Sequence, residues 1–320
     1  MAILEDKKRT KNKHLYIFTE TLKRTKMNTI LKYELPINKD PWIRCYRIHA
    51  NMLNIIGIAY PNFEKYVLSN YLCLHNRKEG CAREYLDFHL ENNYLNIKDV
   101  FRNNDWFDII QLKNINDKYY MNSKHCQEII ISFLNEGYYV LHNINEAYLP
   151  HSPKYKHDKE KSNNIALTYG YNRSEDVLYI LDYAHTGNFG SSSVQINDYL
   201  DSIANVTVAN NLNFIRAKKE LEFRFDIRKS LKLLRCHINS QNAYLDHKDY
   251  DINIFGYEGV ERTLNTLSTH GINMIRLRTL KEHKNIILKY LKYVIDNHYI
   301  DEIKYYEEYQ KIEKNMEIIF

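Results

Sequence analysis

Cysteine is scarce in this sequence, and its five cysteines do not form a metal-binding or disulfide pattern. An odd number of cysteines without paired spacing, in a chain of 320 residues, indicates reduced thiols in a cytoplasmic protein and argues against a disulfide framework. The sequence contains no CxxC or HExxH motif. We therefore expect neither a structural nor a catalytic metal site.

Long hydrophobic runs and a strong excess of one charge are also missing. No stretch approaches the length of a membrane span, and residues 1–14, at the start of the basic arm, lack the apolar centre of a secretory signal. The 45 Lys and Arg residues are nearly balanced by 40 Asp and Glu, giving a net charge of +5, and the 28 tyrosines are spread along the whole chain. Neither feature predicts a nucleic-acid partner, and we expect no contact with a membrane.

What is present is a composition typical of a globular protein, with 44% hydrophobic and 27% charged residues. Periodicity predicts helices first, then strands, then helices, which is an α+β order. We expect a basic N-terminal arm at 1–32, a core at 33–221 with a small antiparallel sheet, and a helical extension at 222–320 packed on that core. The expected helices are 45–57, 61–75, 83–90, 123–135, 196–204, 223–238, 255–267, 274–299 and 300–319; the expected strands are 33–37, 138–144, 163–172, 177–182 and 214–217.

The centre of the pattern is a predicted hairpin formed by residues 163–172 and 177–182, whose β-branched and aromatic residues flank a polar turn. A Gly/Ser-rich turn is expected at 184–193, and Ser192 or Ser193 is expected to begin the helix at 196–204. Asn164 lies at the start of the first strand and Asp182 at the end of the second. Polar side chains at such strand ends can be held rigidly at the edge of a site.

Cys45 is the candidate nucleophile. It follows an irregular segment containing Pro41 and is expected in the first turn of a helix. Unpaired backbone amides and the helix dipole at such a position lower the pKa of a thiol, and the thiolate is the reactive form. The alternative interpretation is a buried helix cysteine, as expected for Cys73, Cys126 and Cys236.

Residues 33–296 resemble the cysteine-peptidase-like proteins of bacterial nonribosomal peptide clusters, which are related to the N-terminal domain of butirosin biosynthesis protein H. The resemblance covers most of the chain and rests on short stretches: 35–36 (LP) with 42–45 (WIRC), 68–71 (LSNY), 133–140 (FLNEGYYV), 146–150 (EAYLP), 169–172 (YGYN), and 276–278 (RLR) with 282–284 (EHK).

The resemblance implies a papain-like fold in which a cysteine takes an acyl group as a thioester and passes it to an amine. It implies a carrier protein as the acyl donor, an amine as the second substrate, and no metal or redox cofactor. Asp182 matches the third catalytic position of the family. Backbone amides near Cys45 would be available to stabilise the oxyanion of a tetrahedral intermediate.

The chain departs from the family at Asn164, which stands where the family has its catalytic histidine. An amide cannot accept a proton at neutral pH, so this position provides no general base. Three interpretations stay open. His157 or His142 supplies the imidazole; or a thioester donor and an acidic thiol need little base assistance; or the chain is a catalytically silent relative that binds a partner.

The leading expectation is therefore a cysteine-dependent acyltransferase that forms an amide in a thiotemplated peptide pathway, with Cys45 as acyl acceptor and Asn164 and Asp182 as polar orienting residues. The alternative is a silent scaffold that binds a carrier protein or a peptide, and peptide hydrolysis ranks third. His283, on an apolar helix face, is expected to be structural.

Overall fold

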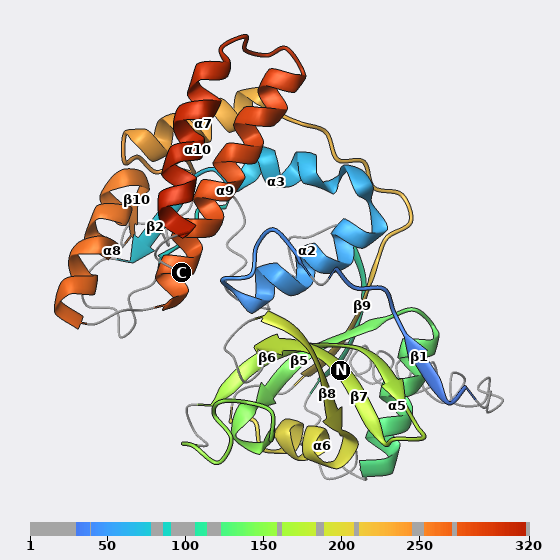
Figure 1. Ribbon diagram of the computed structural model, residues 1–320. Coiled ribbons are helices and arrows are strands. Elements are labelled where there is room, and N and C mark those ends of the chain that lie inside the picture. Colours follow the sequence, from blue (N-terminus) through green and yellow to red (C-terminus); the bar gives the residue numbers. More distant parts are fainter. Residues whose placement is uncertain are drawn as a thin grey trace, which may run out of the picture. The chain divides into compact units, whose positions relative to one another are not determined.

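The computed structural model describes residues 30–38, 40–77, 86–90, 106–113, 123–158, 162–183, 189–207, 211–244, 253–270 and 274–317 (Figure 1). Helices and strands are mixed in it, as expected for an α+β protein. The basic arm lies almost wholly outside the described residues, as do the start of the helix expected at 83–90, residues 184–188 of the Gly/Ser-rich turn, and Cys81. None of the helices in the described ranges has the length and low polarity needed to cross a membrane.

The chain divides into two compact units, each built from two stretches of sequence. Unit 1 takes the described parts of residues 1–36 and 109–216, and unit 2 those of residues 37–108 and 217–320. The expected boundaries at 32 and 221 differ from this division, because residues 37–108 group with the C-terminal helices. Within unit 2, α3 (Glu64–Asn70) packs against α7 (Ile227–Ile238) and α9 (Met274–Asp296).

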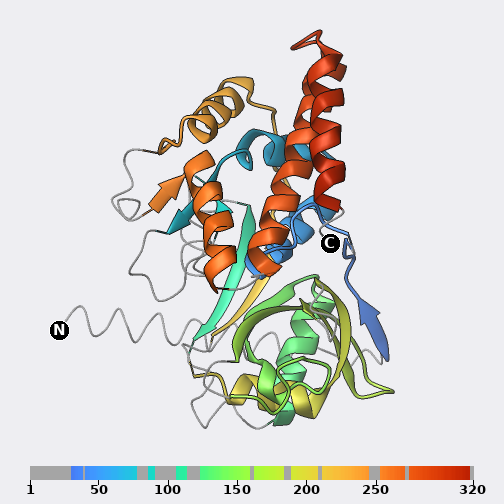
Figure 2. The same cartoon turned by 60° about the vertical axis from the view of Figure 1, so that its left-hand side comes forward.

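Unit 1 is organised by an antiparallel seven-stranded sheet. Its strand order is β4-β9-β5-β6-β7-β8, and β1 pairs with β6. Helices α5 and α6 pack against this sheet in both views (Figures 1 and 2). The elements are β1 (Lys32–Glu34), β4 (Phe107–Lys113), α5 (Ser123–Asn135), β5 (Tyr139–Asn145), β6 (Asn163–Asn172), β7 (Val177–Tyr183), β8 (Phe189–Gln195), α6 (Ile196–Ala204) and β9 (Asn211–Ala217).

The hairpin of β6 and β7 is confirmed, and so are the bounds of α5 and α6. The turn expected at 184–193 is wrong for its second half, because residues from Phe189 onward form β8 and pair with β7 along its whole length. Gln195 precedes α6 and no side chain caps this helix, so neither Ser192 nor Ser193 begins it. Serines that favour turns locally are held extended here by the neighbouring strand.

Unit 2 is mainly helical and contains a small sheet of order β10-β2-β3. The helix expected at 61–75 ends at Asn70 and is followed by strand β2 (Leu74–Arg77). Part of the helix expected at 83–90 forms β3 (Leu86–Phe88). β2 and β3 pair with each other in antiparallel fashion, with Leu74 opposite Phe88, and so satisfy backbone hydrogen bonds. The residue pattern within each segment does not reveal this pairing. The other elements are α2 (Arg47–Ala59), the 3₁₀ turn Pro61–Phe63, β10 (Asn253–Phe255), α8 (Gly256–His270) and α10 (Ile303–Glu317), which lies beside α9.

The helix expected to begin near Phe223 begins at Ile227 instead. The side chain of Asp226 accepts a hydrogen bond from the backbone N–H of Lys229 at 2.9 Å and so caps α7. Capping by aspartate satisfies a backbone donor that the first helical turn leaves without a partner, and it fixes the start of the helix.

A close backbone approach makes glycine necessary at position 170. A Cβ atom there would lie 2.6 Å from the carbonyl oxygen of Tyr33 and 3.0 Å from Cα of Glu34, on the strand that pairs with β6. We expect Gly170→Ala to lower the free energy of unfolding by about 1–3 kcal/mol, because β1 would have to move. Urea unfolding measures this change. Gly190→Ala is the matched control, since a Cβ there meets nothing within 4 Å; equal losses in both variants would contradict the packing argument.

Candidate active site

Unit 1 contains an imidazole paired with a buried carboxylate. Nε2 of His151 lies 2.6 Å from Oδ2 of Asp182, and the hydroxyl of Ser192 donates to Oδ1 of the same carboxylate at 3.0 Å. The side chain of Asp182 is fully buried, while that of His151 is 15% exposed. This carboxylate orients the ring, and a ring that reaches solvent can exchange protons with a substrate.

Local structure holds each member of this pair. Asp182 is on β7, opposite Gly190 of β8, and Ser192 follows two residues later on β8. His151 stands in a segment of tight turns, in which Ser152 N–H donates to the carbonyl of Leu149 at 2.9 Å. The family resemblance placed the histidine at the start of β6, whereas the structure places an imidazole beside Asp182 from this preceding segment.

In the described residues, no hydrogen bond joins the side chains of Asn164 and Asp182. Its amide donates to Oε2 of Glu146 at 3.2 Å, and its side-chain oxygen accepts from the N–H of Ile165 at 3.1 Å. Glu146 is almost fully buried and forms an ion pair with Lys154 at 2.9 Å. The Asn164 amide therefore supplies a hydrogen bond to the buried carboxylate of Glu146, which precedes the segment that carries His151.

The two histidines considered as substitutes have other surroundings. His142 is fully buried; its Nδ1 donates to the carbonyl of Asn143 at 3.0 Å and its Nε2 accepts from the hydroxyl of Tyr199 at 2.6 Å. Burial lowers the pKa of His142 to about 4, so the ring is neutral and structural. His157 is exposed in a turn.

Cys45 lies in unit 2, two residues before the first residue of α2 and not inside its first turn. It is 2% exposed, and its backbone N–H donates to Oε2 of Glu282 at 3.0 Å. Burial raises its pKa well above the usual value, and the charges of Glu282 and Asp87 raise it further. The prediction of a lowered thiol pKa is therefore wrong: Cys45 is a protonated, buried thiol.

A second histidine–carboxylate pair lies in unit 2. Nε2 of His49 is 3.5 Å from Oδ1 of Asp87, and Nδ1 of His49 is 3.2 Å from the hydroxyl of Tyr71. Both His49 and Asp87 are buried. His49 follows Cys45 by four residues in the sequence. The charge of Asp87 contributes to the raised pKa of the Cys45 thiol, after burial and the charge of Glu282.

His283 is structural, as expected. It is fully buried on α9 and its Nε2 donates to the carbonyl of Leu72 at 3.1 Å. Its ring lies 4.6 Å from that of His237, between centroids. Among the described residues, no group of three or more His, Cys, Asp or Glu side chains could hold a metal ion.

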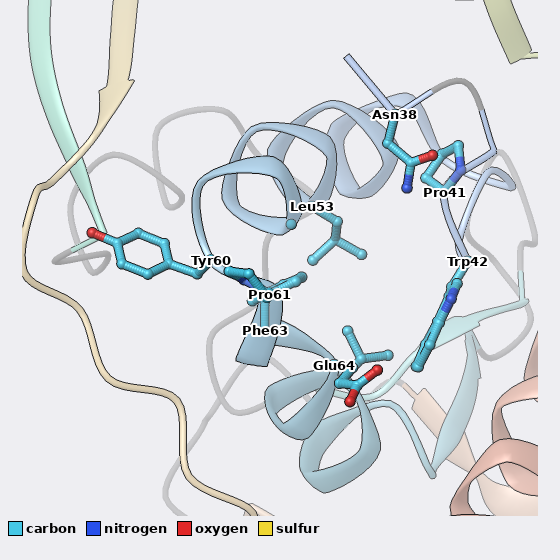
Figure 3. A pocket seen from close by; sticks show the side chains of 10 residues that line it. Asn38, Pro41, Trp42, Leu53, Tyr60, Pro61, Phe63 and Glu64 are labelled. Atoms are coloured by element: carbon cyan, nitrogen blue, oxygen red, sulfur yellow. The ribbon is translucent and has the colours of Figure 1, made fainter. Parts of the chain in front are cut away.

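A cavity of about 160 Å³ lies beside α2 in unit 2, lined mostly by aromatic and apolar side chains (Figure 3). Trp42 forms one wall, Phe63 and Leu53 lie across from it, and Glu64 is the one ionised side chain in the lining. The ammonium group of Lys289 lies 4.0 Å from the centroid of the Trp42 ring. The lining includes no nucleophile and no imidazole, so we do not place the chemistry there.

Two residues of this chemistry were missed by sequence reasoning. His151 directly follows the stretch 146–150 that carries part of the resemblance, and Glu282 stands in the stretch 282–284. Glu282 is thus inside a matched stretch and His151 is next to one, but the partners of both residues are distant in sequence. Neither a protein-family profile nor any curated protein matches the sequence significantly.

Proposed function

We propose that this protein is a cysteine-dependent acyltransferase of papain-like type, which transfers an acyl group from a carrier-protein thioester to an amine. The observation that carries the proposal is the contact of 2.6 Å between His151 and the buried carboxylate of Asp182. It supplies the imidazole that Asn164 cannot supply. With it, the chain has a nucleophile, a base and an orienting acid among its described residues.

The raised pKa of Cys45 makes a base necessary. A thiol that is protonated at neutral pH must lose its proton before the sulfur attacks a thioester. Cys45 belongs to unit 2 and His151 to unit 1, and the roles are assigned by their chemistry.

The reaction proceeds in two balanced steps. The sulfur of Cys45 bonds to the thioester carbonyl carbon, its proton passes to a base, and the carbon–sulfur bond to the carrier breaks as the carrier thiolate takes up a proton. The amine then bonds to the same carbonyl carbon and gives a proton to a base, which returns it to the sulfur. The bond to Cys45 breaks, the thiol is restored, and an amide leaves.

Asp182 and Asn164 have supporting roles in this proposal. Asp182 fixes the tautomer and orientation of His151 and stabilises the imidazolium that forms in each step. Asn164 satisfies Glu146, whose partner Lys154 is in the same turn segment as His151. Asn164 therefore orients the segment and takes no part in proton transfer.

Amide formation tests the proposal. Incubation with a synthetic acyl thioester and a primary amine should give the amide, measured by chromatography, and Cys45→Ala should abolish it. Cys126→Ala is the matched control and should leave the rate unchanged, because Cys126 is also a buried thiol but lies on α5 of unit 1. Amide formed equally fast by Cys45→Ala would contradict the assignment.

A silent binding protein is the second candidate, and the contact between Cys45 and Glu282 favours it. A buried thiol held by a carboxylate is what a cysteine retained for packing would show. The same assay separates the two, because a silent protein forms no amide with any variant. If it also bound a carrier protein, binding would be unaffected by Cys45→Ala.

A further inference from the structure

Glu282 of α9 holds the backbone that precedes α2. Its Oε1 accepts the N–H of Arg44 at 2.8 Å and its Oε2 accepts the N–H of Cys45 at 3.0 Å. The residue is 8% exposed. Two consecutive backbone donors thus converge on one buried carboxylate, which is an anion-binding arrangement of main-chain amides.

The N–H of Cys45 is the donor that the proposed chemistry would use. In acyl transfer, a tetrahedral intermediate carries a negative oxygen next to the nucleophile, and backbone donors aimed at that oxygen stabilise it. In this structure the Glu282 carboxylate has that hydrogen bond. Its Oε2 occupies the position at this donor that the oxygen of the reaction intermediate would take.

Charged groups near Cys45 affect the pKa of its thiol. Glu282 and Asp87 both raise the pKa of the Cys45 thiol, while Thr279 lowers it by hydrogen bonding. Asp87 is paired with His49. Burial raises the pKa of Glu282 itself, against the opposing effect of hydrogen bonds from Cys45 and Arg44 and of the charge of Arg44.

We propose that Glu282 is a positioning residue that occupies the Cys45 amide in the resting protein and restrains Cys45 until the carbonyl oxygen of a thioester takes its place. The inference rests on the proposed function, because it assigns the Cys45 amide to the oxyanion. The restraint is reversible: the carboxylate moves away from the amide when the acyl oxygen arrives, and it returns after the amide product leaves.

Alkylation of Cys45 by iodoacetamide at a series of pH values tests the restraint without any acyl transfer. The sulfur bonds to the reagent's carbon, iodide leaves, and the thiol proton passes to water. We expect Glu282→Gln, which removes the charge with little change of shape, to move the midpoint of the profile to lower pH. At pH 7.5 the rate at Cys45, counted by peptide mapping, should rise about tenfold or more, as a fall of one pKa unit in a thiol would give.

Two further variants keep the result interpretable. Glu261→Gln, an exposed carboxylate on α8, is the matched control and should leave the profile unchanged. Glu282→Asp keeps the charge on a shorter side chain and should restore a midpoint near that of the native protein. Thermal unfolding confirms that each variant is folded at the temperature of the assay.

An unchanged alkylation profile in folded Glu282→Gln would overturn the inference. A shifted profile together with faster acylation of Cys45 by a synthetic thioester is the expected result. If the profile shifts but neither the native protein nor Glu282→Gln is acylated, the restraint on Cys45 stands and the proposed acyltransferase function fails.

Discussion

Replacing His151 by alanine is expected to slow acylation of Cys45 by about 10²–10⁴-fold, which is the usual contribution of a positioned general base. The reason is the buried thiol. With a pKa well above its ordinary value, Cys45 is almost wholly protonated at neutral pH and depends on an acceptor for its proton. Single-turnover kinetics with a synthetic acyl thioester, followed by mass spectrometry of the protein, measures the effect.

The neighbouring histidine provides the control for this experiment. His157 is exposed in the same turn segment, and Cys45 of the His157→Ala variant should be acylated at the native rate. Asp182→Asn keeps the shape of the pair but removes the carboxylate that fixes the ring, so it should lose activity by a comparable factor. Equal rates for His151→Ala and His157→Ala would contradict the role of His151 as the base.

The second large effect is on stability in acid. Burial lowers the pKa of His142 and of His237 to about 4, and it lowers that of His283 well below its usual value. In the unfolded chain these rings bind a proton near pH 6.5. The unfolded state therefore binds more protons than the folded state as the pH falls from 6.5 to 4, and the free energy of unfolding decreases in that range.

The size of the effect follows from the pKa difference. For His142 alone the limiting loss is on the order of 3 kcal/mol once the pH reaches 4, and stability from this source is fully present above pH 6.5. His237 and His283 add to it, because their rings lie 4.6 Å apart and would repel each other if both were charged.

Urea unfolding at pH 7.0, 5.5 and 4.5 measures this dependence. The variant His142→Gln removes one titrating ring and should lose less stability between pH 7.0 and 4.5 than the native protein does. His157→Gln, at an exposed site, should show the native dependence. A native free energy of unfolding that does not change between these pH values would contradict the neutral, buried state of the rings.

Local sequence patterns were sufficient to predict elements whose conformation depends mainly on residues close together in the sequence. The helices at 123–135 and 196–204 and the hairpin of β6 and β7 follow from apolar periodicity and turn residues near in sequence. Strands β3 and β8 could not be found in this way, because pairing with β2 and β7 imposes their extended form. The division into units likewise depends on contacts between residues 37–108 and the C-terminal helices.

The candidate site divides in the same way. Cys45 and Asp182 could be selected because a thiol before a helix and an acid at a strand end are visible in the sequence. His151 could not be paired with Asp182, because the turns after Pro150 decide where its ring points. Glu282 reaches the Cys45 amide across 237 positions of sequence, and no local rule predicts such a contact.

Peptide mapping after incubation with an acyl thioester is the most direct test of the account. We expect one acyl group on the peptide that contains Cys45 and no label in Cys45→Ala. When a primary amine is added, the acyl group should leave the protein as an amide. A folded protein whose Cys45 peptide stays unmodified, at thioester concentrations that label free cysteine, would contradict the central claim that Cys45 carries the acyl group.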